Sequence, residues 1–180
     1  MKKTSDIVQS AIDAMLAEAG EGPWRDVSLR RIAEKAGVPL ADLFVLANGK
    51  DALLDRLSAR FDAAALVTAA TASDDPHDRL FDAVMARVEA MEPHRTALLS
   101  IYRGFAAARV APSLPRTARA LLEAAGLDAT PPRLLAMTAI WIRIVQVWRD
   151  DEGALNRTMA EIDLRLKQMR TRLARIGAGF

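Results

Sequence analysis

Apolar residues recur along this chain at the spacing of amphipathic helices, in stretches that end at glycine, proline or polar clusters. The first stretch ends near Gly20 and carries a stripe of six apolar residues: Ile7, Val8, Ala11, Ile12, Met15 and Leu16. A long helix is predicted from about Lys50 to Ala70, and five more follow over residues 80–91, 97–108, 114–125, 132–149 and 154–176. No segment shows the sustained alternation of a strand. We therefore expect an all-α fold of about nine helices.

Two short helices joined by a tight turn are predicted in the segment VSLRRIAEKAGVPLADLF, residues 27–44. Ser28 is suited to cap the first helix, and Val27 and Ile32 are spaced to pack against each other at its entry. Gly37 is suited to end this helix, and Pro39 to stand in the first turn of the next. This order of signals is typical of a helix-turn-helix unit.

An amphipathic helix precedes this unit, and GKDALLDRL, the start of the long helix, follows it at once. In this arrangement residues 5–66 resemble the N-terminal part of the TetR family of transcription regulators. The resemblance implies a homodimer with a helix-turn-helix DNA-binding domain over residues 1–50 and a helical ligand-binding and dimerisation domain over residues 51–180. It also implies ligand-responsive regulation of transcription through an operator in double-stranded DNA.

The resemblance also implies which residues would contact DNA. They are Ser28, Arg30, Arg31, Pro39, Leu40, Asp42, Phe44, Val45, Leu46 and Lys50. Ser28 and Lys50 match the phosphate contacts of the family. Phe44 lacks the hydroxyl of the tyrosine that is usual at its position, and Leu40 stands where a polar or basic residue is usual. The second helix of the unit therefore departs from the family at the positions that read DNA.

The charge near this second helix is also unfavourable for DNA. Residues 1–60 carry nine Lys and Arg against nine Asp and Glu, whereas residues 157–180 carry six against two, and the whole chain has a net charge of +2. Base reading needs hydrogen-bond donors and acceptors at the groove edges, and the helix offers one carboxylate and one amide. We expect weak, strongly salt-dependent binding in which Arg30, Arg31 and Lys50 supply most phosphate contacts.

A second resemblance opens an alternative function. The segment IWIRIVQVWRDDEGALNRTMAEIDLRLKQM, residues 140–169, is similar to the C-terminal part of the lipid-binding accessory proteins of ubiquinone biosynthesis, which share the TetR fold. This resemblance implies a lipid- or isoprenoid-binding protein of quinone metabolism that no longer binds DNA. In that alternative, the basic helix at the C-terminus would make peripheral contact with a membrane.

Large, soft side chains in the middle helices are candidates for an apolar small-molecule site. We assign to it Met85, Met91, Tyr102, Phe105, Met137, Trp141, Arg143 and Trp148. The alternative is that these residues form ordinary core. Because a guanidinium within IWIRIVQV is costly unless it is paired, Arg143 either bonds a carboxylate of the protein or awaits an acidic ligand.

The last helix has the most regular pattern in the chain. Its apolar residues are spaced four and three apart over three heptads: Leu155, Met159, Ile162, Leu166, Met169, Leu173 and Ile176. We predict a dimer interface centred on Met159, Ile162, Leu166, Met169 and Leu173. The alternatives are packing within one subunit and, because the remaining faces are basic, contact with an anionic membrane.

Enzymatic chemistry has little support in the sequence. The chain has no cysteine, and its two histidines, His77 and His94, stand in no metal-ligand spacing. There is no glycine-rich phosphate loop and no nucleophile elbow. We expect no enzyme activity, no metal and no cofactor. The apolar runs are too short to cross a bilayer and the N-terminus does not resemble a signal peptide, so we expect a cytoplasmic protein.

Overall fold

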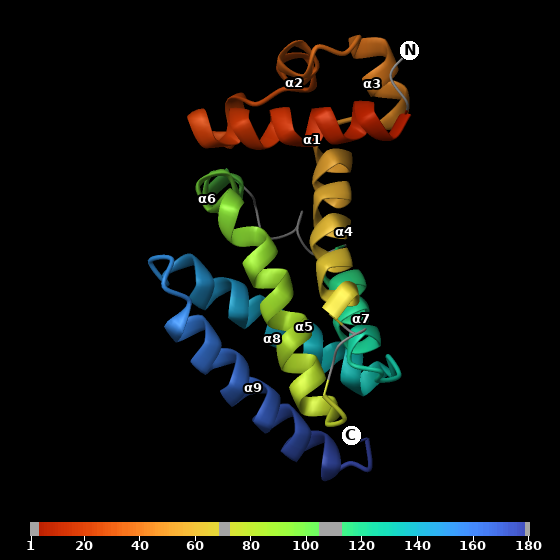
Figure 1. The fold of residues 1–180 in the computed structure, drawn as a ribbon, viewed down its shortest axis with the longest axis vertical. Coiled ribbons are helices and arrows are strands. Elements are labelled where there is room, and N and C mark those ends of the chain that lie inside the picture. The colour runs from red at the N-terminus through yellow and green to blue at the C-terminus, as the bar shows by residue number, and fades with distance from the viewer. Residues whose placement is uncertain (1–3, 69–72, 105–112, 179–180) are drawn as a thin grey trace. The chain divides into compact units, whose positions relative to one another are not determined.

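The computed structural model describes residues 4–68, 73–104 and 113–178, and all its regular structure is helical (Figure 1). These residues form nine α-helices: α1 Thr4–Glu21, α2 Leu29–Ala36, α3 Leu40–Leu46, α4 Lys50–Thr68, α5 Pro76–Met91, α6 Arg95–Gly104, α7 Leu114–Ala124, α8 Pro131–Arg149 and α9 Asn156–Ala174. Two short 3-10 helices, η1 (Trp24–Asp26) and η3 (Glu92–His94), complete them. The all-α prediction is confirmed. Among the described helices, none combines the length and the apolar character that crossing a membrane requires.

The chain divides into two compact units, and the division falls inside α4. The first unit contains Met1–Ala59 and Pro93–Arg109, and the second contains Arg60–Glu92 and Val110–Phe180. The first unit therefore extends beyond residue 50, the end of the predicted N-terminal domain, and includes α6. One consequence concerns the candidate ligand residues: Tyr102, on α6, belongs to the first unit, whereas Trp141 and Arg143 belong to the second.

In the first unit, α1 packs against α2, α3 and α6. Figure 1 shows α2 and α3 lying against the same long helix α1. The core between them contains Met15, Ile32 and Leu43, each fully buried. These are the apolar positions that the helical periodicity selects, because a helix can only bury the stripe that repeats at its own period.

The predicted start and end signals of α2 are confirmed. Ser28 Oγ accepts a hydrogen bond from the Arg31 backbone N–H at 3.3 Å, and Val27 and Ile32 are both buried at the helix entry. Gly37 has a φ of +62°, the left-handed conformation that glycine adopts without a Cβ penalty. Pro39 lies one residue earlier than predicted: it is the N-cap of α3, with ψ of 133°, rather than part of its first turn.

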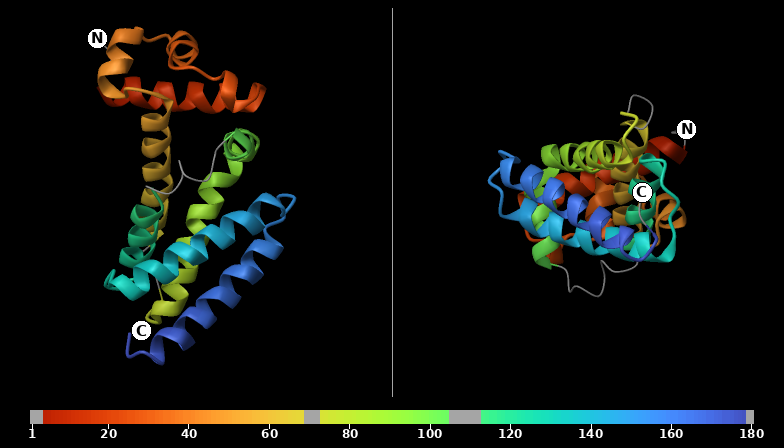
Figure 2. Two further views of the ribbon diagram at one scale, coloured as in Figure 1. Left: turned by 180° about the vertical axis from the view of Figure 1, so that it is seen from behind. Right: turned by 90° about the horizontal axis from the view of Figure 1, so that it is seen from below.

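In the second unit, α8 and α9 form a helical hairpin, with α9 packed on α5 and α7 on α5 and α8. Figure 2 shows α8 and α9 side by side from behind. Asp151, in the connection between them, accepts hydrogen bonds at 2.7 Å from the backbone N–H and the hydroxyl of Thr158, in the first turn of α9. This buried carboxylate replaces the missing side-chain cap at Leu155 and fixes where α9 begins.

The apolar seam of α9 lies inside its own chain. Ile162, Leu166, Met169 and Leu173 are each 5% exposed or less, whereas Met159 remains exposed. The predicted dimer interface is therefore corrected: four of its five residues already pack within the subunit, against the α5 and α8 side of the helix. A heptad seam specifies packing against neighbouring helices at a shallow angle, but it does not specify whether those helices belong to the same chain.

Candidate DNA-binding surface and ligand site

The outer face of α3 is largely apolar. Val45 is 84% exposed, Phe44 56% and Leu40 36%, while Leu43 on the opposite face is fully buried. Pro39 and Asp42 are also exposed, and Leu46 is half-buried. This is the surface that the family resemblance implies for base reading. This surface presents aromatic and aliphatic carbon together with one carboxylate, that of Asp42. An ionised carboxylate accepts hydrogen bonds but cannot donate them.

Two of the basic residues near α3 are engaged by the carboxylate of Glu18, which is buried on α1. Arg31 Nε lies 2.7 Å from Glu18 Oε2, and Lys35 Nζ lies 3.2 Å from Glu18 Oε1 and 2.6 Å from Glu21 Oε1. The hydrogen bond from Lys35, and then that from Arg31, hold the pKa of Glu18 below its usual value, against the opposing effect of burial. These contacts tie α2 to α1 and reduce the positive charge that α2 offers to a phosphate.

Lys50 is engaged in a different way. Its ammonium donates hydrogen bonds to the backbone carbonyls of Trp24, at 2.8 Å, and Val27, at 2.7 Å, and it lies 4.4 Å from the centre of the Trp24 ring. These contacts connect the first turn of α4 to the η1 segment. Lys50 therefore has a structural role in this conformation, whereas the resemblance implied a phosphate contact.

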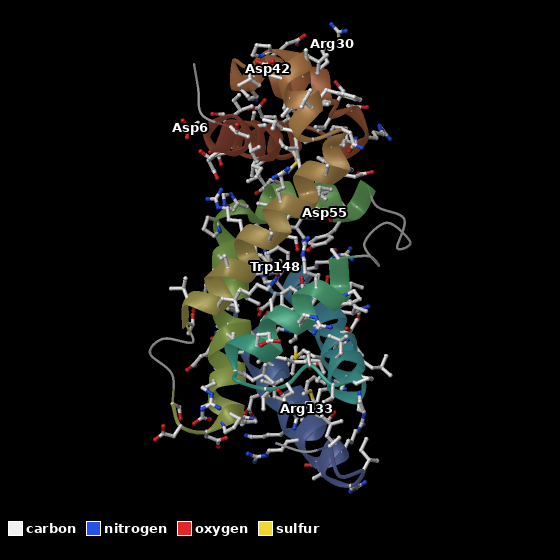
Figure 3. The ribbon with its side chains drawn as sticks, turned by 90° about the vertical axis from the view of Figure 1, so that its right-hand side faces the viewer. Asp6, Arg30, Asp42, Asp55, Arg133 and Trp148 are labelled. Carbon is white, nitrogen blue, oxygen red and sulfur yellow. The ribbon has the colours of Figure 1, made fainter. Side chains whose placement is uncertain are left out.

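Arg30 and Ser28 keep groups that a phosphate could accept. Figure 3 labels Arg30 on α2 and Asp42 on α3, both on the outer side of the helix-turn-helix. Arg30 is exposed and forms no ion pair within the described residues. Ser28 uses its oxygen as an acceptor in the cap, so its hydroxyl proton can still be donated. Among the ten candidate contact residues, Arg30 is the cation whose guanidinium is held neither by an ion pair nor by a backbone carbonyl of the described residues, whereas Arg31 keeps only the N–H groups that Glu18 does not engage.

In the second unit, five of the six candidate ligand residues lie in the core. Met91, Met137, Trp141 and Trp148 are buried almost completely, and Met85 is buried as well. The indole N–H of Trp148, labelled in Figure 3, donates to Glu92 Oε2 at 2.7 Å. Phe105 lies outside the described residues.

Arg143 is paired with a carboxylate of the protein, which is the first of the two arrangements that the sequence allowed. Its Nε lies 2.9 Å from Glu161 Oε1, so the ion pair joins α8 to α9. The side chain is half-exposed on these helices and not enclosed in the core. Glu161 also accepts from Arg165 Nε at 2.7 Å, and these two bonds, that from Arg165 first, lower the pKa of Glu161 against the effect of burial.

The second unit contains a buried polar cluster that the sequence did not predict. Asp62 on α4, Arg87 on α5 and Thr117 on α7 are each 5% exposed or less. Arg87 Nε and the Thr117 hydroxyl both donate to Asp62 Oδ1, at 2.8 and 3.0 Å. The guanidinium of Arg87 also lies over the ring of Trp141, 4.3 Å from its centre. The sequence signal that could have found this cluster is a charged residue next to a core position. Asp62 directly follows Phe61, which the helical periodicity assigns to the core.

One oxygen of this cluster is left without a hydrogen bond. Asp62 Oδ2 is buried and has no hydrogen-bond partner, although Arg116 Nε lies 3.4 Å away in an ion pair. Buried carboxylate oxygens normally accept at least one hydrogen bond, because water is no longer present to supply it. The oxygen is therefore an acceptor that the hydrogen bonds of the protein leave unsatisfied, in a cluster whose Arg87 guanidinium lies over the ring of Trp141 and 5.9 Å from the centre of the Phe61 ring.

Metal-binding chemistry has no counterpart in the part of the chain that the structure describes, where no group of three His, Cys, Asp or Glu side chains is arranged to hold an ion. His77 is buried in the first turn of α5, with Nδ1 3.5 Å from Asp78 Oδ1 and Nε2 without a hydrogen bond.

The fold of the chain is similar to that of two solved regulators. No protein-family model matches the sequence, and neither does any curated protein. A TetR transcriptional regulator from Rhodococcus sp. RHA1 is 16% identical and matches with a TM-score of 0.74, over 96% of this chain and 100% of its own. The fatty acid degradation regulator FadR from Bacillus halodurans is also 16% identical, with a TM-score of 0.56 over 94% of this chain and 96% of its own. At these identities the likeness concerns architecture, and the chain has the fold of the TetR transcription regulators.

Proposed function

We propose that this protein is a ligand-responsive transcription regulator that binds operator DNA as a homodimer. The observation that carries the proposal is the complete helix-turn-helix, with α2 capped by Ser28, the turn formed at Gly37 and the outer face of α3 open to solvent. The two solved structures compared above are both described as regulators.

The DNA contact that we propose is weak and depends mainly on phosphate. Arg30 and the hydroxyl of Ser28 bind the backbone, while Phe44 and Val45 contact thymine methyl groups in the major groove. Because Arg31, Lys35 and Lys50 are engaged within the protein, few cations per subunit neutralise phosphates. We therefore expect binding that is measurable at low salt and lost at moderate salt.

The proposed ligand occupies the second unit next to the cluster of Asp62, Arg87 and Trp141. Asp62 Oδ2 supplies an acceptor, and Phe61, Trp141 and Met91 supply apolar surface, so the ligand is an apolar molecule with a hydroxyl or amine donor. Because α4 carries Asp62 and begins with Lys50 in the helix-turn-helix unit, a ligand that displaces Asp62 acts on the helix shared by both units.

The proposed dimer uses α8 in place of the α9 seam. Leu135, Ala139, Ile142 and Gln146 are exposed and spaced four, three and four residues apart, which forms one uncharged stripe along α8. We expect Ile142→Glu to convert a dimer to a monomer in light scattering while the helical circular dichroism stays the same. A wild-type monomer at micromolar concentration would remove this part of the proposal.

The decisive experiment for the DNA contact is titration of fluorescent upstream fragments at low and moderate salt. We expect Arg30→Ala to abolish binding at unchanged stability, and Arg119→Ala, at an exposed position on α7, to leave binding intact. Lys50→Ala should weaken binding only as far as it destabilises the first unit. If no fragment binds at low salt, the regulator proposal is wrong.

A specific observation favours a second candidate function, the lipid- or isoprenoid-binding protein without DNA binding. The exposed part of α3 carries Leu40, Phe44 and Val45 and has no cation. In this alternative, α9 contacts a membrane only through its basic face, because its apolar seam is buried. Native mass spectrometry of protein purified without detergent tests it: a retained lipid mass supports this candidate, and the mass of the bare chain contradicts it.

A further inference from the structure

A pocket of about 580 Å³ lies in the first unit, where α6 packs against α1 and η1 (Figure 1). The last turn of α1 forms one wall and α6 forms another. The volume is within the range of roughly 300–1,000 Å³ that is usual for small-molecule sites. None of the described residues that line the pocket belongs to α8, to α9 or to the candidate DNA contacts. Neither the proposed dimer nor the proposed DNA contact therefore uses these residues.

Three glycines determine the shape of this pocket. A Cβ added at Gly20 or Gly22 would meet no other atom within 4 Å, so the space beside these two residues is open. At Gly104, by contrast, an added Cβ would lie 2.9 Å from Cβ and Cδ1 of Trp24, so glycine allows the end of α6 to approach η1 closely. Ser100 Oγ donates to the Gly22 carbonyl at 2.9 Å and connects α6 to the residue that follows α1. The walls are therefore held together, while glycine keeps side chains out of the space between them.

The α6 wall carries hydrogen-bond donors. Thr96, Ser100 and Arg103 are spaced four and three residues apart, so they lie on one face of the helix, and all three line the pocket. Arg103 is exposed, and within the described residues no ion pair or hydrogen bond engages its guanidinium. Arg25 also lines the pocket, but its Nε lies 3.7 Å from the carboxylate of Asp26. Because a guanidinium carries only donors in a planar fork that matches two carboxylate oxygens, the α6 wall is suited to a carboxylate.

The α1 wall carries hydrogen-bond acceptors. The last carbonyl groups of an α-helix have no partner within the helix, and they form the negative end of its dipole. The Gly22 N–H donates to the carbonyl of Glu18 at 3.1 Å, and the carbonyls of Gly20 and Glu21 follow in the last turn. The carboxylate of Glu21 adds a negative charge, which Lys35 offsets in part from 2.6 Å away. This wall is suited to an ammonium group, which can only donate hydrogen bonds.

We propose that this pocket binds a free α-amino acid with an apolar side chain. Such a molecule is a zwitterion: its carboxylate pairs with Arg103 and the Thr96 hydroxyl, and its ammonium group is held by the last carbonyls of α1 and by Glu21. Its side chain lies against Pro23, which is exposed and apolar. A ligand with a single charge meets an opposite charge on one wall and a like charge on the other, so the two walls together favour a zwitterion. The site is separate from the ligand proposed beside Asp62 and requires no DNA.

The test uses the full-length protein and L-leucine as the probe, followed by ¹H–¹⁵N correlation spectra in the absence of DNA. We expect saturable shifts of the Gly20, Gly22 and Gly104 amides and of the Trp24 indole at millimolar leucine. Isocaproate, which lacks the ammonium group, and isoamylamine, which lacks the carboxylate, should each bind at least ~tenfold more weakly, because each loses charge-assisted hydrogen bonds. Glycine, which lacks the side chain, should also bind more weakly than leucine.

Two variants and a matched control locate the site, each with its fold checked by circular dichroism. Arg103→Gln should weaken leucine binding about tenfold and leave isoamylamine binding unchanged, because the amine has no carboxylate for the guanidinium to bind. Arg119→Gln, which removes the same charge from an exposed position on α7, should change neither. Gly20→Leu places a side chain in the open space and should abolish the shifts at Gly22 and Gly104.

Four outcomes would overturn the proposal. They are the absence of saturable shifts with leucine, binding of isocaproate or isoamylamine as tight as that of leucine, equal effects of Arg103→Gln and Arg119→Gln, and shifts confined to the second unit. Since the measurement contains no operator, a failure of the protein to bind DNA would leave this result unchanged.

Discussion

Both compact units contain ion pairs that join neighbouring helices, but they place them in different environments. In the first unit, Glu18 is paired with Arg31 and Lys35, whose side chains remain partly in solvent. In the second, the Asp62 and Arg87 side chains are only 7% and 4% exposed. Solvent screens the first group, so it contributes little to stability and chiefly determines which cations are available to a partner. Both members of the second pair are removed from water, so neither can be lost alone without a large cost.

The largest expected effect comes from breaking the buried pair. Arg87→Met leaves the Asp62 carboxylate in the core without its strongest partner, and we expect a loss of about 3–5 kcal/mol in the free energy of unfolding. Urea denaturation followed by the signals of Trp141 and Trp148 measures it. The double variant Asp62→Leu with Arg87→Met removes both charges and should recover most of this loss. Equal stability of Arg87→Met and wild type would show that the pair does not anchor the second unit.

The next effect separates buried from exposed positions within α9. Leu166 is fully buried and Leu164 is 47% exposed, so the two form a matched pair on one helix. Leu166→Ala should cost about 2–5 kcal/mol because it leaves a cavity, while Leu164→Ala should cost within about 0.5 kcal/mol. Thermal unfolding at several protein concentrations measures both. If Leu166→Ala instead changes only the dimer dissociation constant, the α9 seam faces a partner after all.

A smaller effect concerns the structural role of Lys50 in the first unit. Lys50→Met removes two hydrogen bonds from an ammonium to backbone carbonyls, and we expect a loss of about 1–3 kcal/mol. The indole N–H signal of Trp24 reports this unit during denaturation. Arg30→Met, an exposed cation on α2, is the control and should change the stability by less than about 0.5 kcal/mol. If Lys50→Met leaves the free energy of unfolding unchanged, Lys50 again becomes a candidate for a DNA contact.

The smallest effect is a pH dependence that both units share. Glu18 and Glu161 have pKa values below the usual 4.5 in the folded protein, so the folded state binds fewer protons than the unfolded one. Their contribution is therefore present above pH 4.5 and is lost as the pH falls through the folded pKa values. Glu18→Gln should flatten this dependence for the Trp24 signal, and Glu161→Gln for those of Trp141 and Trp148. A dependence that is unchanged in both variants would assign the acid sensitivity to other carboxylates.

The sequence alone determined the class and the helical punctuation of this protein. The helical period, Ser28 at a cap and Gly37 at a positive φ are local properties, in which a few neighbouring residues decide the backbone conformation. For the same reason the bounds of α7, α8 and α9 were predicted to within two residues.

Only the tertiary structure decided which partner each side chain has. An apolar stripe predicts that a helix packs against other helices, but it does not specify which chain those helices belong to. Leu166 was therefore assigned to a dimer interface, although it lies in the core of its own subunit. Whether a cation near a recognition helix is available to DNA depends on carboxylates that are distant in sequence. Glu18, for example, accepts a hydrogen bond from Arg31, which is thirteen positions away. The buried network of Asp62, Arg87 and Thr117 joins three helices, and such pairings have no periodic signature. Local interactions are determined by adjacent residues in the sequence. Burial and ion pairing depend on distances between helices, which are set only after the helices have packed.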